Sequence, residues 1–320
     1  MKYYIGNTDK EWYDYLSKIV PEDINFWQPG GNSSFKVLEM GAPFLLRLKS
    51  PINKIAGVGF FSSHSILPVN YAWEVFENKN GVSSYAELRR IINHYRGSLN
   101  LNENPNIGCI VLSSPIFFNE NDWIDVPINW ANSIVQGKSY ETSEEIGGHY
   151  WHNLVEPLLY KYAHSNAMKE YTINDDLPRV FVDNEEAPRY GQYLTNVRIG
   201  QSAFRVLVTD AYKRRCSISG EKTLPVLEAA HIKSYSECGV NKTSNGILLR
   251  ADIHKLYDNG YITITSNYCV EVSRRIKEEF ENGRDYYKYH GQHVLILPDS
   301  KKDLPDKEYL RWHNENIYRG

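Results

Sequence analysis

Residues 202–259 constrain the fold more than any other part of this chain. Apolar side chains at helical spacing predict a helix over Ser202–Arg215, which ends before a Cys-Ser-Ile-Ser-Gly turn. The apolar run Val226–Ile232 is typical of a strand, and an Asn-Gly turn introduces a second strand, Ile247–Leu249. A short helix over Asp252–Asn259 follows at once and ends at a glycine. The segment is therefore predicted to fold as helix, strand, turn, strand and helix.

Four side chains of this segment have the chemistry that metal-assisted phosphodiester hydrolysis needs. His231, on the first strand, can deprotonate water, and Asn245 can fix the loop beside it. His254 and Asp258 stand four residues apart on one face of the second helix, where they can hold a divalent ion. Each residue alone also has a structural explanation, since buried histidines and contacts between helical neighbours are common. Their joint spacing favours the catalytic interpretation.

The segment resembles the HNH (ββα-metal) nuclease family over about residues 198–275, and within it the restriction-endonuclease branch. Four sequence phrases carry the resemblance: Arg215-Cys-Ser-Ile-Ser-Gly220, Leu227-Glu-Ala-Ala-His-Ile232, Asn245-Gly-Ile-Leu-Leu-Arg250 and Ala251-Asp-Ile-His-Lys-Leu-Tyr-Asp258. By position, the resemblance implies that His231 is the general base, that Asn245 fixes the loop, and that His254 is a metal ligand. It also implies an enzyme that cleaves DNA.

One expected metal ligand is missing from this pattern. Many HNH nucleases carry Asp or His just before the base, where this chain has Ala230. Glu228 projects from the same face of the strand and is the first candidate for a substitute ligand, and Asp258 is the second. A set of imidazole and carboxylate ligands suits Mg²⁺ or Mn²⁺, and imidazole also accepts Ni²⁺, Co²⁺ or Zn²⁺. Because the 4 cysteines include no CxxC pair, we expect no structural zinc.

The N-terminal part of the chain alternates short apolar runs with Gly, Pro and Asn. The runs Phe44–Leu48, Ile55–Phe61 and Ile107–Leu112 are predicted strands, and Ser84–Tyr95 is a predicted helix with a serine cap. The phrases that resemble PUA-like domains, a superfamily that includes the EVE and SRA modules, are Phe26-Trp-Gln-Pro29, Lys49-Ser-Pro51 with Ile55-Ala-Gly57, and Tyr71-Ala-Trp-Glu74. The resemblance covers about residues 1–140 and implies a β-barrel-type domain. The predicted fold class is therefore α+β, with a PUA-like domain followed by an HNH ββα-metal nuclease domain.

Several PUA-like modules accept a flipped, modified base in an aromatic pocket, so the resemblance implies a site for 5-methyl- or 5-hydroxymethylcytosine. Ring stacking and hydrogen bonds to the base edge then replace the stacking and pairing lost from the duplex. The candidate stacking residues are Phe26, Trp27, Tyr71 and Trp73, and the candidate edge-reading residues are Gln28, Asn32 and Glu74. Tryptophans of a β-rich domain also commonly fill its core, and that alternative stays open.

A chain of 320 residues is about twice as long as a typical single domain, so we expect two domains. Residues 1–140 would form the recognition domain, 141–195 a linker with some helix, and 196–320 the nuclease domain. Hydrophobic residues make up 42% and charged residues 23%, which excludes a disordered chain. No apolar run is long enough to cross a bilayer and the first ten residues lack a signal-peptide pattern, so we expect a cytoplasmic protein.

The basic run Lys213, Arg214 and Arg215 is a candidate for contacts with the DNA backbone, although the end of a helix also explains it. Together these observations predict a modification-dependent (type IV) restriction endonuclease that acts on double-stranded DNA by base flipping. Because one HNH site opens one strand, we expect a homodimer. Two alternatives stay open: a conventional HNH restriction endonuclease that reads unmodified DNA, and a non-catalytic protein with a decayed HNH fold that binds DNA or modified RNA.

Overall fold

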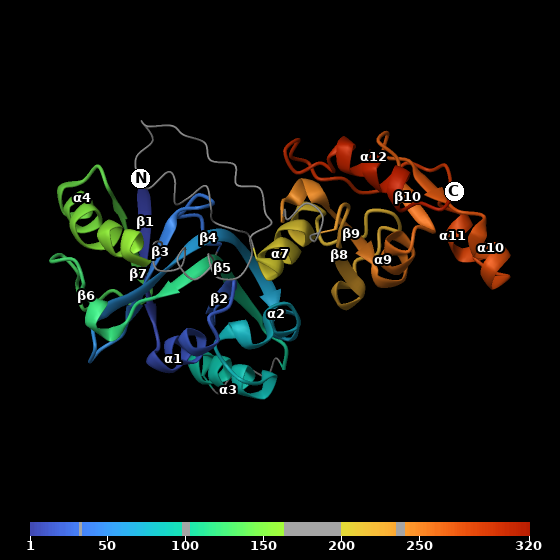
Figure 1. The fold of residues 1–320 in the computed structure, drawn as a ribbon. Helices are drawn as coiled ribbons and strands as arrows, with labels where there is room; N and C mark the ends of the chain where they lie inside the picture. The colour runs from blue at the N-terminus through green and yellow to red at the C-terminus, as the bar shows by residue number, and fades with distance from the viewer. Residues whose placement is uncertain (32–33, 98–102, 163–199, 235–240) are drawn as a thin grey trace, which may run out of the picture. The chain divides into compact units, whose positions relative to one another are not determined.

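The computed structural model describes residues 1–31, 34–97, 103–162, 200–234 and 241–320. The chain divides into two compact units, Met1–Arg198 and Ile199–Gly320. Figure 1 shows both, coloured from blue at the N-terminus to red at the C-terminus. Each unit has a hydrophobic core of its own.

A seven-stranded sheet organises the first unit (Figure 1). The strands are β1 (Lys2–Thr8), β2 (Asp23–Gln28), β3 (Pro43–Leu48), β4 (Lys54–Pro68), β5 (Asn106–Phe117), β6 (Ile124–Asp125) and β7 (Gly137–Glu141). Their order is β2-β5-β4-β3-β1-β7, with β6 paired to β4. β1 and β3 run parallel, whereas the other pairs are antiparallel.

Helices in the described part of the first unit accompany this sheet. They are α1 (Lys10–Ile19), α2 (Val69–Phe76), α3 (Tyr85–Arg96) and α4 (Glu145–Tyr150). Helix α4 continues through a π-helical turn, Trp151–Val155, to residue 162. The predicted serine cap of α3 is present, because the Ser84 hydroxyl accepts a hydrogen bond from the backbone N–H of Glu87.

Side chains alternate between the two faces of the sheet along each strand, and both faces are buried. On β1, Tyr4 packs in a cluster that includes Trp12 of α1, whereas Tyr3 packs in a second cluster with Tyr150 and Trp151. Helix α1 therefore covers one face, and α4 with its continuation covers the other. The helical part of the segment expected to be a linker thus belongs to the core of the first unit.

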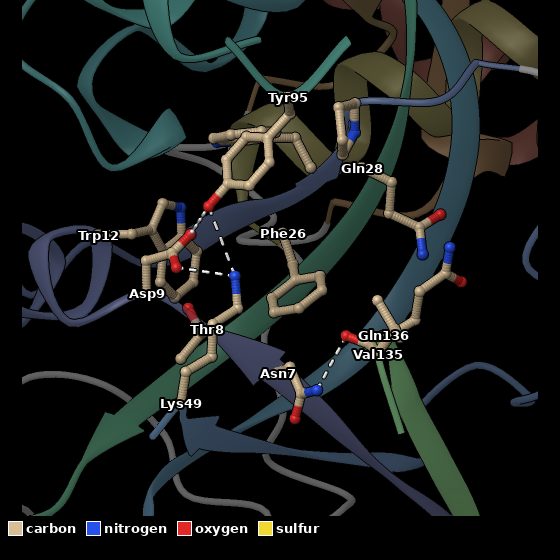
Figure 2. A pocket seen from close by; sticks show the side chains of 12 residues that line it. Asn7, Thr8, Asp9, Trp12, Phe26, Gln28, Lys49, Tyr95, Val135 and Gln136 are labelled. Atoms are coloured by element: carbon tan, nitrogen blue, oxygen red, sulfur yellow. Dashed lines mark hydrogen bonds and ion pairs between the residues drawn. The ribbon is translucent and has the colours of Figure 1, made fainter. Parts of the chain in front are cut away.

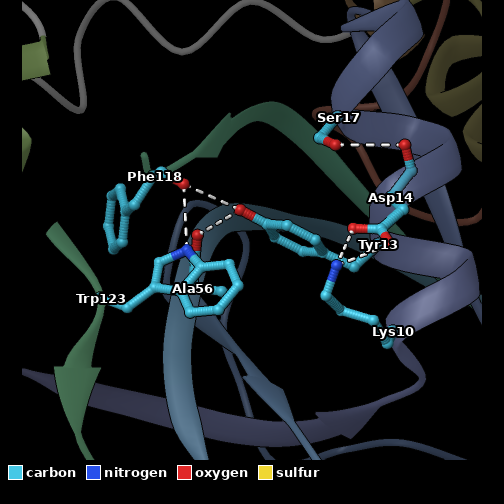
Figure 3. Close-up of polar contacts among 7 residues, drawn as sticks. All are labelled: Lys10, Tyr13, Asp14, Ser17, Ala56, Phe118 and Trp123. Atoms are coloured by element: carbon cyan, nitrogen blue, oxygen red, sulfur yellow. Dashed lines mark hydrogen bonds and ion pairs between the residues drawn. The ribbon is translucent and has the colours of Figure 1, made fainter. Parts of the chain in front are cut away.

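A buried tyrosine fixes helix α1 to the sheet. The Tyr13 hydroxyl lies 2.9 Å from the carbonyl oxygen of Ala56 and 3.0 Å from that of Phe118, to which it donates (Figure 3). The indole N–H of Trp123 donates to the same Phe118 carbonyl at 3.1 Å. Burial raises the pKa of Tyr13, so its hydroxyl stays protonated and remains a donor. These bonds hold α1, and the polar residue Asp9 just before it, in place.

The second unit is built around a hairpin and the helix that follows it. Its elements are α7 (Gln201–Ala211), β8 (Leu227–His231), β9 (Gly246–Arg250), α9 (Ala251–Asp258), β10 (Ile262–Ile264), β11 (Val270–Val272), α10 (Arg275–Phe280), α11 (Arg284–Tyr287) and α12 (Lys307–Asn316). β8 pairs with β9 and β10 with β11, both antiparallel. Helices α7 and α9 and strand β9 share one core, which includes Phe204, Leu248 and Ile253.

The predicted α+β class is confirmed, as a mixed fold with one large sheet in the first unit. The three predicted N-terminal strands lie within β3, β4 and β5, and the predicted order of helix, strand, strand and helix is present from α7 to α9. Helix α7 ends at Ala211, however, well before the predicted end at Arg215. Lys213 and Arg214 both take a left-handed backbone, with φ of 56°, which cannot continue a right-handed helix. In the described part of the chain, no helix is long and apolar enough to cross a membrane.

Candidate functional site

Strands β8 and β9 and helix α9 gather the residues predicted for catalysis. In the antiparallel register, His231 pairs with Gly246 and Glu228 pairs with Leu249. Because α9 begins directly after β9, the chain turns back and brings His254 against the side chain of Glu228 on β8. Residues that are far apart in the sequence therefore meet at a strand-to-helix corner.

Asn245 holds the loop that follows β8. Its side chain is fully buried, its Nδ2 donates to the carbonyl of Lys233 at 3.0 Å, and its Oδ1 accepts from the backbone N–H of Lys233 at 3.0 Å. Its own carbonyl accepts from the backbone N–H of Ile232 at 2.9 Å. These three bonds fix the backbone beside His231, which is the task that the HNH resemblance implies for this residue.

The imidazole of His231 is held at its face and at its edge. Its ring stacks on Phe204, with centroids 4.0 Å apart and an interplanar angle of 9°. Its Nε2 lies 2.9 Å from Oδ1 of Asn241. Burial lowers the pKa of His231, and the hydrogen bond with Asn241 opposes this only in part. The ring is therefore neutral near pH 7, the form that can accept a proton.

His254 lies between two carboxylates. Its Nδ1 is 2.6 Å from Oε2 of Glu228, and its Nε2 is 3.3 Å from Oδ2 of Asp258. Burial acts to lower the pKa of His254, but the bonds to Asp258 and Glu228 outweigh it, and the pKa is raised. The two carboxylates therefore contact opposite edges of one imidazole rather than meeting at a common point.

The residues at this corner fit a divalent cation in their chemistry. Within the described residues, no three His, Cys, Asp or Glu side chains are gathered as a complete metal site. Ala230, at the position of the missing ligand, is fully buried in the core. Nε2 of His254 and the carboxylate of Asp258 face each other, and Mg²⁺ or Mn²⁺ commonly combines a few such protein donors with water. Glu228 faces the other ring nitrogen, the position of a residue that orients a metal-binding histidine.

The basic run after α7 forms a turn. Nζ of Lys213 lies 2.6 Å from Oδ1 of Asp299, and Nε of Arg214 lies 3.1 Å from Oδ1 of Asp210. Nε of Arg215 donates to a backbone carbonyl at 3.4 Å. These ion pairs are exposed, so they contribute little stability and can exchange for contacts with phosphate.

A pocket of about 210 Å³ lies within the first unit (Figure 2). Three residues predicted to bind a base line it: Phe26 and Trp27, which supply aromatic surface, and Gln28, which supplies an amide. Phe26 is buried and packs edge-on against Trp12. Trp27 is half-buried and donates its indole N–H to the Asn80 carbonyl at 2.9 Å. The remaining lining residues are Asn7, Thr8, Asp9, Trp12, Pro29, Lys49, Tyr95, Val135 and Gln136.

The other residues predicted to bind a base do not line this pocket. Tyr71, Trp73 and Glu74 belong to α2. Tyr71 is 2% exposed, the Trp73 ring packs against the Tyr85 ring, and Glu74 is exposed. Asn32 lies outside the described residues. The structure therefore brings together the candidates on β2 and separates them from those on α2.

The sequence analysis missed several polar residues of the pocket as site residues, and three of them form a charged network. Nζ of Lys49 lies 2.7 Å from Oδ1 of Asp9, and the Tyr95 hydroxyl donates to Oδ2 of Asp9 at 2.8 Å. Burial acts to lower the pKa of Lys49, but Asp9 outweighs it and raises the pKa, so the amine stays charged. These residues come from three separate segments, and only the phrase that begins at Lys49 gave a signal in the sequence.

Comparisons with known proteins bear on both units. Residues 216–265 match the family described as HNH endonuclease. Among solved structures, the chain is similar to ASCH from Zymomonas mobilis, with 11% identity, a TM-score of 0.26, and coverage of 37% of this chain and 74% of that chain. It is also similar to the modification-dependent TagI restriction endonuclease, with 13% identity, a TM-score of 0.27, and coverage of 92% of this chain and 75% of that chain. No curated protein matches the chain significantly.

The family match spans the hairpin, the helix after it, and the three residues His231, Asn245 and His254. HNH nucleases generally depend on a divalent metal, which agrees with the donor set at this corner. The second unit therefore carries an HNH endonuclease domain, and the chain is a DNA-hydrolysing enzyme.

Proposed function

We propose that the protein is a modification-dependent restriction endonuclease that hydrolyses double-stranded DNA containing modified cytosine. The observation that carries the proposal is the aromatic and polar pocket of the first unit, in a chain whose second unit has an HNH endonuclease domain. A pocket of this size suits one base, and a base read in a pocket has to leave the duplex. The first unit would then decide which DNA the second unit cuts.

In the proposed reaction, His231 acts as the general base. Its neutral imidazole accepts a proton from the attacking water, whose oxygen forms a bond to phosphorus while the bond from phosphorus to the 3′ oxygen breaks. The stack on Phe204 and the bond to Asn241 orient the ring. Asn245 keeps the loop beside His231 in position.

His254 and Asp258 would hold the divalent cation, and Glu228 would orient the His254 ring through Nδ1. When bound, Mg²⁺ or Mn²⁺ stabilises the negative charge that develops on the phosphate and on the leaving 3′ oxygen. Lys213 and its two arginine neighbours would contact the DNA backbone.

The modified base would be read by residues of β2. Phe26 and Trp27 offer faces for stacking, and Gln28 offers an amide for a hydrogen bond to the base. Such contacts compensate for the stacking and pairing that the base loses when it leaves the duplex. The α2 residues Tyr71 and Trp73 contribute to packing in this account.

The test is the cleavage of three duplexes that share one sequence and differ at a single cytosine, which is plain, 5-methylated or 5-hydroxymethylated. With Mg²⁺ or Mn²⁺ present, we expect at least one modified duplex to be cut more than about tenfold faster than the plain one, a difference of about 1.4 kcal/mol. Equal cutting of all three would favour a conventional restriction enzyme. Binding without any cutting would favour a non-catalytic protein.

We also propose that two copies act together, because one HNH site opens one strand and a double-strand break needs two. A homodimer with two-fold symmetry is the simplest arrangement. The rate of double-strand breaks should then rise more steeply than linearly with protein concentration below the dimer dissociation constant. Single-strand nicks alone, at any concentration, would contradict this proposal.

A further inference from the structure

The pocket of the first unit is electrically balanced. Its lining includes one acidic and one basic side chain, Asp9 and Lys49, which neutralise each other at 2.7 Å. An anion such as phosphate would have to displace Asp9 from Lys49 before it gained a charged contact. The pocket therefore favours an uncharged ligand over a phosphate group.

The size and walls of the pocket suit one planar ring. Its volume of about 210 Å³ is smaller than the roughly 300–1,000 Å³ of sites for drug-sized ligands. Trp12, Phe26 and Trp27 supply aromatic surface on which a ring can stack. One nucleobase with a small substituent meets these requirements better than a whole nucleotide does.

Polar groups occupy two separate sides of the pocket. Figure 2 shows Asp9, Lys49 and Tyr95 on one side of Phe26. Their mutual bonds use only part of the roughly four acceptor positions of a carboxylate and the three donors of an ammonium group. This side can therefore both accept from and donate to the hydrogen-bonding edge of a base.

On the other side, the amide groups of Gln28 and Gln136 extend toward each other (Figure 2). A pyrimidine that places its Watson–Crick edge against Asp9 and Lys49 points its opposite edge, with the substituent at C5, toward these two amides. Each amide offers both donors and an acceptor, which a hydroxyl group can satisfy and a methyl group cannot.

We propose that this pocket selects 5-hydroxymethylcytosine over 5-methylcytosine, with Gln28 and Gln136 binding the hydroxyl group. The inference rests on the proposed function and deepens it, because it names the modification. It assigns the Watson–Crick edge to Asp9 and Lys49 rather than to the predicted residues Asn32 and Glu74.

The test measures binding of the full chain to duplexes with one hydroxymethylated, methylated or plain cytosine. Fluorescence anisotropy without divalent metal reports binding alone, since no cleavage occurs. We expect the hydroxymethylated duplex to bind about three- to tenfold more tightly than the methylated one, the contribution of one additional hydrogen bond. Gln28→Met and Gln136→Met should weaken binding of the hydroxymethylated duplex more than binding of the methylated duplex, and so lower this ratio toward one. Gln292→Met, an exposed glutamine of the second unit, is the matched control and should change nothing.

A second pair of variants tests the opposite side of the pocket. Asp9→Asn should weaken binding of both modified duplexes by a similar factor, about threefold or more, and keep the ratio between them. Asp14→Asn is its control. Like Asp9, Asp14 pairs with a lysine, here Lys10, but it does not line the pocket. An unfolding temperature equal to that of the wild type excludes misfolding of a variant as the cause.

The outcomes separate this inference from the proposed function. If the methylated duplex binds as tightly as the hydroxymethylated one, or if neither glutamine variant changes the ratio, the inference is overturned while modification dependence stands. If the wild-type chain binds all three duplexes equally, the proposed function fails as well.

Discussion

At the scale of single residues, the two carboxylates beside His254 contact different nitrogens of the ring, and we propose a different task for each. Glu228 lies 2.6 Å from Nδ1, and Asp258 lies 3.3 Å from Nε2. A carboxylate that accepts a hydrogen bond from one nitrogen fixes the tautomer of the ring and directs the other nitrogen toward a metal. The arrangement favours Asp258 as the ligand and Glu228 as the orienting residue.

Amide substitutions distinguish these two roles. Asp258→Asn should weaken Mn²⁺ binding by about ten- to a hundredfold, because an amide is a poorer ligand. Glu228→Gln should change it less than about threefold, since the amide oxygen still accepts from Nδ1–H, whereas Glu228→Ala should cost about tenfold. Calorimetric titration of the full chain without DNA measures these affinities, with the exposed Glu278→Gln as control. A loss in Glu228→Gln as large as in Asp258→Asn would make Glu228 a direct ligand.

The pH dependence of cleavage should report the pKa of His231. A general base must be unprotonated, and burial lowers the pKa of this imidazole, so activity should persist below the usual histidine pKa of about 6.5. With Mg²⁺ or Mn²⁺ at saturating concentration, where the metal outcompetes the proton on His254, the acid limb of kcat/KM against pH should therefore lie below pH 6.5. Phe204→Leu uncovers one face of the ring and should move this limb upward. A wild-type limb at or above pH 6.5 would contradict the assigned environment of His231.

Residues whose positions depend on local spacing were predictable from the sequence. His231, Asn245 and His254 lie on consecutive elements of one short segment, so their order in the chain determines their proximity. Asp9 and Lys49 meet only because β1 and β3 pair in parallel across the sheet. No local pattern encodes such a pairing, and the charged network of the pocket was therefore missed.

At the scale of elements, α7 packs closely against the start of β9. A Cβ atom at Gly246 would clash with Cγ2 of Val208 and lie 2.9 Å from the ring of Phe204. Gly246→Ala should therefore lower the free energy of unfolding by about 1–3 kcal/mol, the usual cost of overpacking. Gly30→Ala is the control, because nothing lies within 4 Å of a Cβ atom there. If the two variants lose the same amount of stability against thermal unfolding, the contact between α7 and β9 is looser than described.

Helix α4 shows why some elements escape prediction. Gly147 and Gly148 lower helix propensity, and the sequence therefore indicated an interrupted segment at this point. In the structure both glycines are buried, and a Cβ atom on either would collide with the backbone oxygens of Glu141 and Thr142. The glycines allow the helix to approach the chain after β7 closely, so tertiary packing outweighs local preference.

At the scale of the whole molecule, recognition and hydrolysis are assigned to two units with separate cores. The expected domain limits at residues 140 and 196 remain proposals, and residues 145–162 pack with the first unit. A substitution at the nuclease corner should therefore alter cleavage without altering which DNA is bound.

His231→Ala in the full chain tests this division most directly. With Mg²⁺ or Mn²⁺, cleavage of the modified duplex should fall by about 10²- to 10⁴-fold, the usual contribution of a general base. The dissociation constant for the same duplex, measured by anisotropy without metal, should stay within about twofold of the wild-type value. Cleavage by His231→Ala at a rate close to that of the wild type would contradict the account, because another group would then be the base.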